Sequence, residues 1–183
     1  MEIRLLTREE LNRSLDLVWK VLCDYEAVNY TEYSKRVFME YMHFLDLLQD
    51  KNDEVAYTTA KRIAAESELS DKYYKYIPEF AKLLNHQKSY LRTRAMILCC
   101  SQARWDNEGV IAKYLPQMLK LVHDEKPTVV RQSLNALKEV VAFRPELCKA
   151  IAMELKNMNI PGYKDSMIGL IQKDVTELKE LMN

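Results

Sequence analysis

Glycine and proline are scarce in this chain of 183 residues, which contains only 3 glycines and 5 prolines. Tight hairpins and bulges use glycine for positive φ, so a fold of many short strands is disfavoured. Leucine, lysine, glutamate, alanine and methionine are abundant instead, and all five are good helix formers. The composition therefore predicts an all-α protein.

Net charge is also absent, because 27 basic side chains balance 27 acidic ones. Proteins that bind nucleic acid over a broad surface are usually basic, so the balance disfavours such a partner and leaves room only for a local patch. No apolar run approaches the roughly 20 residues that span a bilayer, and the first residues lack the apolar core of a signal peptide. We expect a cytoplasmic protein with no membrane partner.

Motifs for catalysis are missing as well. The cysteines at 23, 99, 100 and 148 form no C-x-x-C pair, and buried, reduced thiols explain them best. The histidines at 43, 86 and 123 lack zinc-binding spacing. A P-loop, a nucleophile elbow and paired metal carboxylates are not found either. We therefore predict no enzyme activity, no metal and no cofactor.

Helical spacing of apolar residues runs through most of the sequence. Helices are predicted to begin near residues 7 and 31, and further helices at about 53–67, 71–84, 89–104, 107–123, 127–143, 145–157 and 164–181. Asp53 is the predicted N-cap of the helix over 53–67, and Pro127 and Pro145 lie at predicted first turns. Ile3–Leu6 is the only strand candidate, and four residues alone cannot make a sheet.

One apolar segment recurs at a fixed distance. The segment Tyr76-Ile77-Pro78 reappears 38 residues later as Tyr114-Leu115-Pro116, and each copy is followed by a polar turn and a second helix. A single hairpin cannot bury its own apolar face, but stacked hairpins form a continuous core. We predict a right-handed α-solenoid of about four hairpins over 43–183, with 1–42 as an N-terminal helical cap. The mid-helix proline should bend the first helix of each unit.

These features resemble HEAT repeats. The resemblance is to small bacterial HEAT-repeat, armadillo-like proteins, some of which are catalogued as "SufBD". It is carried by Ser89–Arg94, Ala103–Asp106, Asp124–Pro127, Arg131-Gln132 and Tyr163–Met167. It implies an all-helical protein that binds other macromolecules. The arginine usual after the first aliphatic residue is present as Arg92 but is replaced by Ala56 and Val130, and no cysteine cluster supports iron–sulfur chemistry.

The first 42 residues resemble something else. Ile3-Arg4-Leu5-Leu6-Thr7 with Leu15–Trp19 is similar to the opening strand and helix of GNAT-type N-acetyltransferases. That family binds the pyrophosphate of acetyl-CoA with a glycine-rich loop before a helix. The glycines at 109, 162 and 169 are isolated, so no such loop exists here. We interpret this segment as a cap on the solenoid and not as an enzyme.

A basic stretch without acidic residues extends from His86 to Arg104 and is followed by Trp105. Second helices of HEAT units line the concave surface, so we expect a binding groove there. Its predicted residues are Lys88, Arg94, Trp105, Arg131, Gln132, Lys164 and Lys173. Such a groove suits phosphate or an acidic peptide. The alternative interpretation is structural: Arg92 would bond a neighbouring repeat and Trp105 would fill a gap between hairpins.

The leading hypothesis is a non-catalytic scaffold whose concave face binds an acidic or helical segment of another protein. The second hypothesis is a nucleic-acid-binding protein related in fold to HEAT-like DNA glycosylases for alkylated bases, which is an argument by analogy. The zero net charge weighs against the second hypothesis.

Overall fold

The computed structural model describes residue 48, residues 52–158 and residues 162–182. The chain divides into two compact units, Met1–Leu47 and Leu48–Asn183. The predicted cap over 1–42 and the strand candidate Ile3–Leu6 lie outside the described residues. The helices presented below all belong to the second unit.

Seven α-helices and four short 3₁₀ segments make up the secondary structure of the described residues, and no strand occurs among them. In chain order they are α3 (Asp53–Ser67), η1 (Tyr74–Tyr76), α4 (Ile77–Lys82), α5 (Ser89–Cys100), η2 (Ala103–Trp105), α6 (Val110–Leu119), η3 (Lys120–His123), α7 (Pro127–Phe143), η4 (Pro145–Leu147), α8 (Cys148–Lys156) and α9 (Asp165–Glu180). The prediction of an all-α fold is confirmed for this part of the chain. No helix there is long and apolar enough to cross a membrane.

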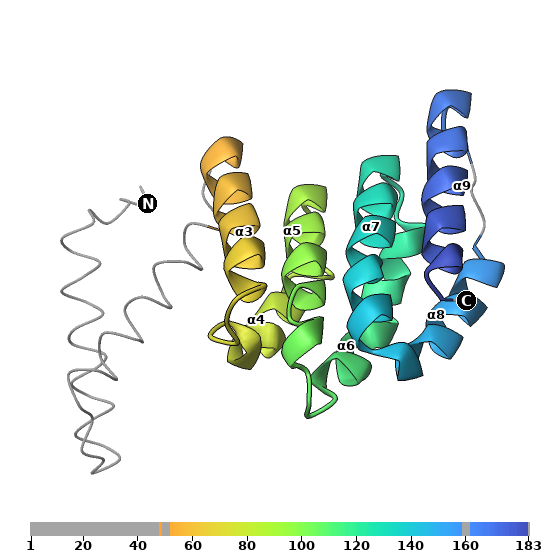
Figure 1. Ribbon diagram of the computed structural model, residues 1–183. Helices are drawn as coiled ribbons and strands as arrows, with labels where there is room; N and C mark the ends of the chain where they lie inside the picture. Colours follow the sequence, from red (N-terminus) through yellow and green to blue (C-terminus); the bar gives the residue numbers. More distant parts are fainter. Residues whose placement is uncertain (1–47, 49–51, 159–161, 183) are drawn as a thin grey trace, which may run out of the picture. The chain divides into compact units, whose positions relative to one another are not determined.

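The helices form two layers (Figure 1). The long-helix layer consists of α3, α5, α7 and α9 side by side, with α5 packed against α3 and α7, and α7 packed against α9. The short-helix layer consists of α4, α6 and α8, and α4 packs against α5 and α6. Both layers contribute fully buried side chains, including Phe80, Leu98, Ile111, Leu137 and Ile151. The hydrophobic core therefore lies between the layers.

Local sequence signals explain where several helices begin. Pro127 is the first residue of α7, as predicted, since a missing N–H costs nothing there. The predicted N-cap Asp53 is wrong by one residue: Asn52 caps α3, and its side chain accepts a hydrogen bond of 3.0 Å from the amide of Glu54. Pro78 lies in the first turn of α4 and not in mid-helix, whereas Pro116 does lie inside α6.

Candidate functional site

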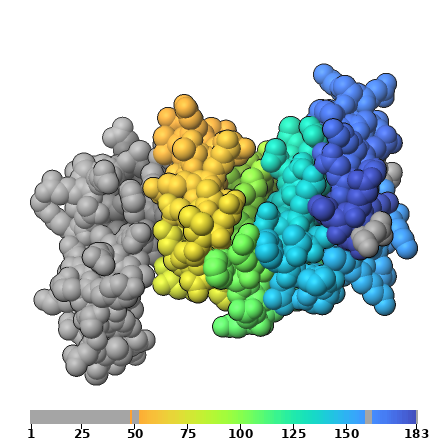
Figure 2. Space-filling view, viewed as in Figure 1, coloured from red at the N-terminus to blue at the C-terminus, as the bar shows by residue number. Residues whose placement is uncertain are grey.

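A recess of about 150 Å³ lies on the long-helix layer, across α3, α5 and α7. In the space-filling view, α5 appears only as a narrow band set back between α3 and α7 (Figure 2). The lining residues are Ala64, Ser67, Glu68, Ile97, Cys100, Ser101, Arg104, Gln132, Asn135, Ala136 and Glu139. The methyl groups of Ala64 and Ala136 are too short to fill the space between the helices, which leaves the recess open.

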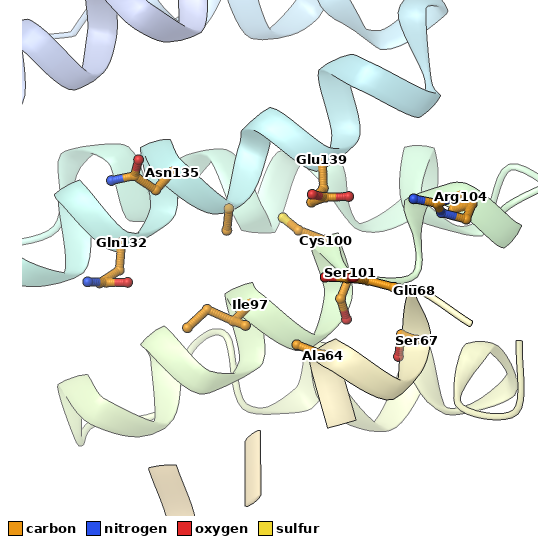
Figure 3. A pocket seen from close by; sticks show the side chains of 11 residues that line it. Ala64, Ser67, Glu68, Ile97, Cys100, Ser101, Arg104, Gln132, Asn135 and Glu139 are labelled. Atoms are coloured by element: carbon orange, nitrogen blue, oxygen red, sulfur yellow. The ribbon is translucent and has the colours of Figure 1, made fainter. Parts of the chain in front are cut away.

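The rim of the recess combines amide and charged groups (Figure 3). Gln132 and Asn135 lie at one end, and Arg104 lies at the other. The carboxylates of Glu68 and Glu139 also line the recess, so its charge is mixed. The Arg104 guanidinium carbon lies 4.3 Å from the centre of the Phe143 ring, a stacking that holds it in place. This arrangement can seat an apolar group while offering donors and acceptors around it.

Arg94 does not point into solvent, and the prediction that it lines an open basic groove is wrong. The residue is only 2% exposed. Its guanidinium donates to the Asp53 carboxylate at 2.6 Å and to the Leu48 carbonyl at 3.1 Å. A buried cation must be paired, because leaving it unpaired away from water is very costly. Arg94 therefore fastens the start of α3 to α5.

Arg131 is likewise engaged with a carboxylate. Its side chain donates from Nε to Asp174 Oδ2 at 2.6 Å and from the terminal nitrogen Nη2 to Oδ1 at 3.3 Å. The hydrogen bond to Asp174 raises the pKa of Arg131. Asp174 is buried on α9, so this pair joins α7 to α9. The structure gives no shared anion site to Arg94 and Arg131, since each already has its own acidic partner.

Arg92 links successive hairpins, as the structural interpretation predicted. Its Nε and one terminal nitrogen donate to both oxygens of Asp124, at 2.7 and 2.8 Å. The other terminal nitrogen donates to the carbonyls of His86 and Gln87, both at 2.8 Å. The hydrogen bond to Asp124 is also the main cause of a raised pKa of Arg92. This paired fork is the strong form of arginine–carboxylate contact.

Trp105 is partly buried, and its indole N–H donates to the Ser67 carbonyl at 2.6 Å. Ser67 is the last residue of α3, so this bond satisfies a carbonyl at the helix end and fastens η2 to α3. This bond gives Trp105 a structural role between η2 and α3. Trp105 is not a lining residue of the recess, although Arg104 beside it is.

The other four predicted residues are exposed and scattered. Gln132 lines the recess. Lys88 lies before α5 with its Nζ 5.7 Å from the Tyr90 ring, Lys164 lies directly before α9, and Lys173 lies 3.8 Å from Glu177. These three lysines do not line the recess, so among the seven predicted residues the structure places one there.

A buried acidic group whose side chain accepts three hydrogen bonds was missed by the sequence analysis. Asp106 is fully buried. Its Oδ1 accepts from the Tyr74 hydroxyl at 2.8 Å and from the amide of Val110 at 2.7 Å, and its Oδ2 accepts from the amide of Ile111 at 3.0 Å. Asp106 thus satisfies the first N–H groups of α6. Burial, together with this hydrogen bond, raises the pKa of Tyr74 to about 12. The sequence signal was an aspartate directly before the helix predicted over 107–123.

Two neighbouring cysteines, Cys99 and Cys100, are buried and unpaired by any disulfide. Burial raises the pKa of both thiols well above the usual value, which removes the reactive thiolate. Among the residues that the structure describes, no group of three His, Cys, Asp or Glu side chains could hold a metal ion.

Comparison with known proteins gives no match: no family model, no curated protein and no solved structure is similar to this chain.

Proposed function

We propose that this protein is a non-catalytic scaffold that binds a helical segment of another protein on its long-helix layer, with one side chain of that segment in the recess. The observation that carries the proposal is the recess itself. It spans three neighbouring helices, and its small floor residues Ala64 and Ala136 leave room for a foreign side chain. A cavity of about 150 Å³ is large enough for a benzene-sized group.

The proposal includes a HEAT-like solenoid architecture, which the hydrogen bonds between hairpins support. The Tyr74 hydroxyl donates to Asp106, the Asn85 amide to Gln117, and the Arg92 guanidinium to Asp124. Each of these bonds spans 32 residues of sequence. Stacked repeats are expected to contact each other at a constant separation in sequence, because each repeat packs against its neighbour in the same way.

The charges favour a helical ligand without a large excess of acidic residues. Asp53 and Asp174 already neutralise Arg94 and Arg131. At the recess, Glu68 and Glu139 face whatever binds, and like charges across an interface are unfavourable. At the recess the same reasoning lowers the support for nucleic acid, since a phosphate backbone needs several unpaired cations along one surface and Arg94 and Arg131 are both paired.

The test is to fill the recess. Ala136→Trp places an indole in it, whereas Ala142→Trp adds the same group to an exposed position of the same helix. Each tagged variant is used to capture proteins from the native cytoplasm, with quantification by mass spectrometry and thermal melting as the folding control. We expect Ala136→Trp to melt normally and lose partners that wild type and Ala142→Trp retain. Equal capture by both variants would refute the recess as the binding site.

A further inference from the structure

A second, larger hollow lies in the other layer. An apolar groove of about 750 Å³ runs between α6 and α8 in the short-helix layer. Its lining residues are Ala112, Leu115, Pro116, Leu119, Lys120, His123, Leu147, Ala150, Met153, Glu154 and Asn157. The groove shares no lining residue with the recess on α3, α5 and α7. It therefore requires its own explanation.

The groove exists because short side chains face each other across it. Leu115 and Leu119 form a floor that is almost fully buried, whereas Ala112 and Ala150 are exposed alanines that cannot close the space above it. Met153 is 58% exposed at the wall. Hollows lined by apolar groups are typical binding sites, and methionine adapts its shape to different ligands.

Two rows of lysines flank the groove. Lys113 and Lys120 are seven residues apart along α6 and its extension η3, and Lys149 and Lys156 are seven apart along α8. Seven residues are about two helical turns, so each pair lies on one side of its helix. The groove-lining positions of each helix lie beside its lysine pair on the helical wheel. The four lysines are exposed, and none of them forms an ion pair within the described part of the chain.

The acidic residues near the groove are already engaged. In residues 110–123 and 145–156 the carboxylates are Glu146 and Glu154. Glu146 pairs with Arg144 at 2.5 Å, and the carboxylate of Glu154 is in hydrogen-bond contact with the His123 ring at 2.7 Å. Within these two stretches four lysines face two glutamates, so the helices that line the groove carry a net positive charge.

We propose that the α6–α8 groove binds an acidic amphipathic helix of a partner protein. Its apolar residues at i, i+3, i+4 and i+7 would fill the hollow over Leu115 and Leu119, and glutamates on either side would meet the two lysine rows. The groove follows α6 from Ala112 to His123, a length of about three helical turns. An anionic bilayer fits less well, because membrane-binding helices present a protruding apolar face and not a hollow. This site does not depend on the function proposed for the recess.

The direct test uses a designed peptide as the probe. A fluorescent peptide of about 18 residues carries leucines at i, i+3, i+4 and i+7 and glutamates elsewhere, enough for about five turns. One control has the same composition in scrambled order, and another replaces the glutamates by lysines. Fluorescence anisotropy should show saturable binding of the acidic peptide and at least about tenfold weaker binding of both controls. No saturable binding, or equal binding of the lysine peptide, would overturn the proposal.

Variants locate the binding. Ala150→Trp fills the groove, and the double variant Lys120→Glu, Lys149→Glu inverts one charge in each row; both should weaken peptide binding about tenfold or more. The matched controls lie at exposed positions elsewhere: Ala142→Trp for the variant that fills the groove, and the double variant Lys61→Glu, Lys82→Glu for the charge inversion. A third variant, Ala136→Trp, tests the recess. All three should bind as wild type does. Loss of binding in Ala136→Trp with none in Ala150→Trp would assign the peptide to the recess and refute the groove.

An anionic bilayer is the competing partner, and a separate vesicle experiment tests it. Vesicles containing phosphatidylserine are sedimented with the wild-type protein at the same salt concentration. We expect the protein to remain in the supernatant. Sedimentation that is lost in the Lys120→Glu, Lys149→Glu variant would mean that the lysine rows serve a membrane, and it would overturn the helix proposal.

Discussion

Replacing Arg94 by alanine removes a buried cation and the hydrogen bonds that it donates to Leu48 and Asp53. The bond of 2.6 Å to the Asp53 carboxylate and the bond of 3.1 Å to the Leu48 carbonyl involve a charged donor, and such bonds contribute about 1.5–3 kcal/mol each. The Asp53 side chain is 72% exposed, so water replaces part of that interaction. The truncation also leaves a cavity. We expect a loss of about 2–5 kcal/mol, the range for truncating a large buried side chain to alanine.

Glutamate at position 94 should be worse than alanine. It would bury a carboxylate against the Leu48 carbonyl and the Asp53 carboxylate, which both repel it. The expected loss exceeds about 5 kcal/mol, which is comparable to the whole stability of many domains. Lys88→Glu is the control, because Lys88 is exposed and precedes α5, where a negative charge is tolerated or favourable.

The assay for these variants is urea unfolding followed by far-ultraviolet circular dichroism, with linear extrapolation to water. Arg94→Met separates packing from charge, because methionine keeps part of the side-chain volume without the donors. It should fall between wild type and alanine. A loss below about 1 kcal/mol for Arg94→Ala would refute the reasoning and would fit an arginine in solvent, as the sequence analysis had expected.

Three further predictions concern buried groups. Asp106→Ala should destabilise by about 3–5 kcal/mol in the same assay, because it leaves the Tyr74 hydroxyl and two N–H groups of α6 unpaired; a loss under about 1 kcal/mol would contradict this. The pKa of Tyr74 is about 12 in the folded protein, so the unfolded chain loses this proton first, near pH 10, and the stabilisation is lost as the pH rises from about 10 to 12. The urea midpoint of wild type should therefore fall more than that of Tyr74→Phe over this window, and equal falls would exclude the effect. Ellman's reagent should modify the partly exposed Cys148 in the folded protein but reach Cys99 and Cys100 only on unfolding, because burial raises the pKa of both thiols. Rapid reaction of Cys99 and Cys100 together with Cys148 would argue against their burial.

The helices that the sequence predicted well have strong local signals at their ends. The expected helix over 127–143 is α7, Pro127–Phe143, because Pro127 starts it without losing a hydrogen bond. The expected helix over 164–181 is α9, Asp165–Glu180. The expected helix over 107–123 was less accurate, because α6 begins at Val110 after a glycine with positive φ and ends in a 3₁₀ turn. Periodicity alone does not distinguish those geometries.

The site was harder to predict because the partner of each arginine is far away in sequence. Arg94 bonds Asp53 over 41 residues, and Arg131 bonds Asp174 over 43. Helical spacing can place an arginine on a helix face, but it does not show which carboxylate the next helix brings to it. Gln132, which was predicted on the concave surface, is exposed and lines the recess. Arg92 was placed correctly because its repeat position predicted a contact between hairpins.

The two layers use their basic residues differently, and this difference has a consequence for binding. In the long-helix layer, Arg92, Arg94 and Arg131 pair with carboxylates and hold neighbouring elements together. In the short-helix layer, the lysine rows beside the α6–α8 groove remain exposed. Lysine suits that position, because its strongly hydrated ammonium on a flexible stem adapts to a ligand, whereas the planar fork of arginine suits fixed paired geometry. A long-helix surface with mixed charge and a short-helix groove with positive charge would select different segments. Because the two sites share no lining residue, a substitution that fills one should leave binding at the other unchanged.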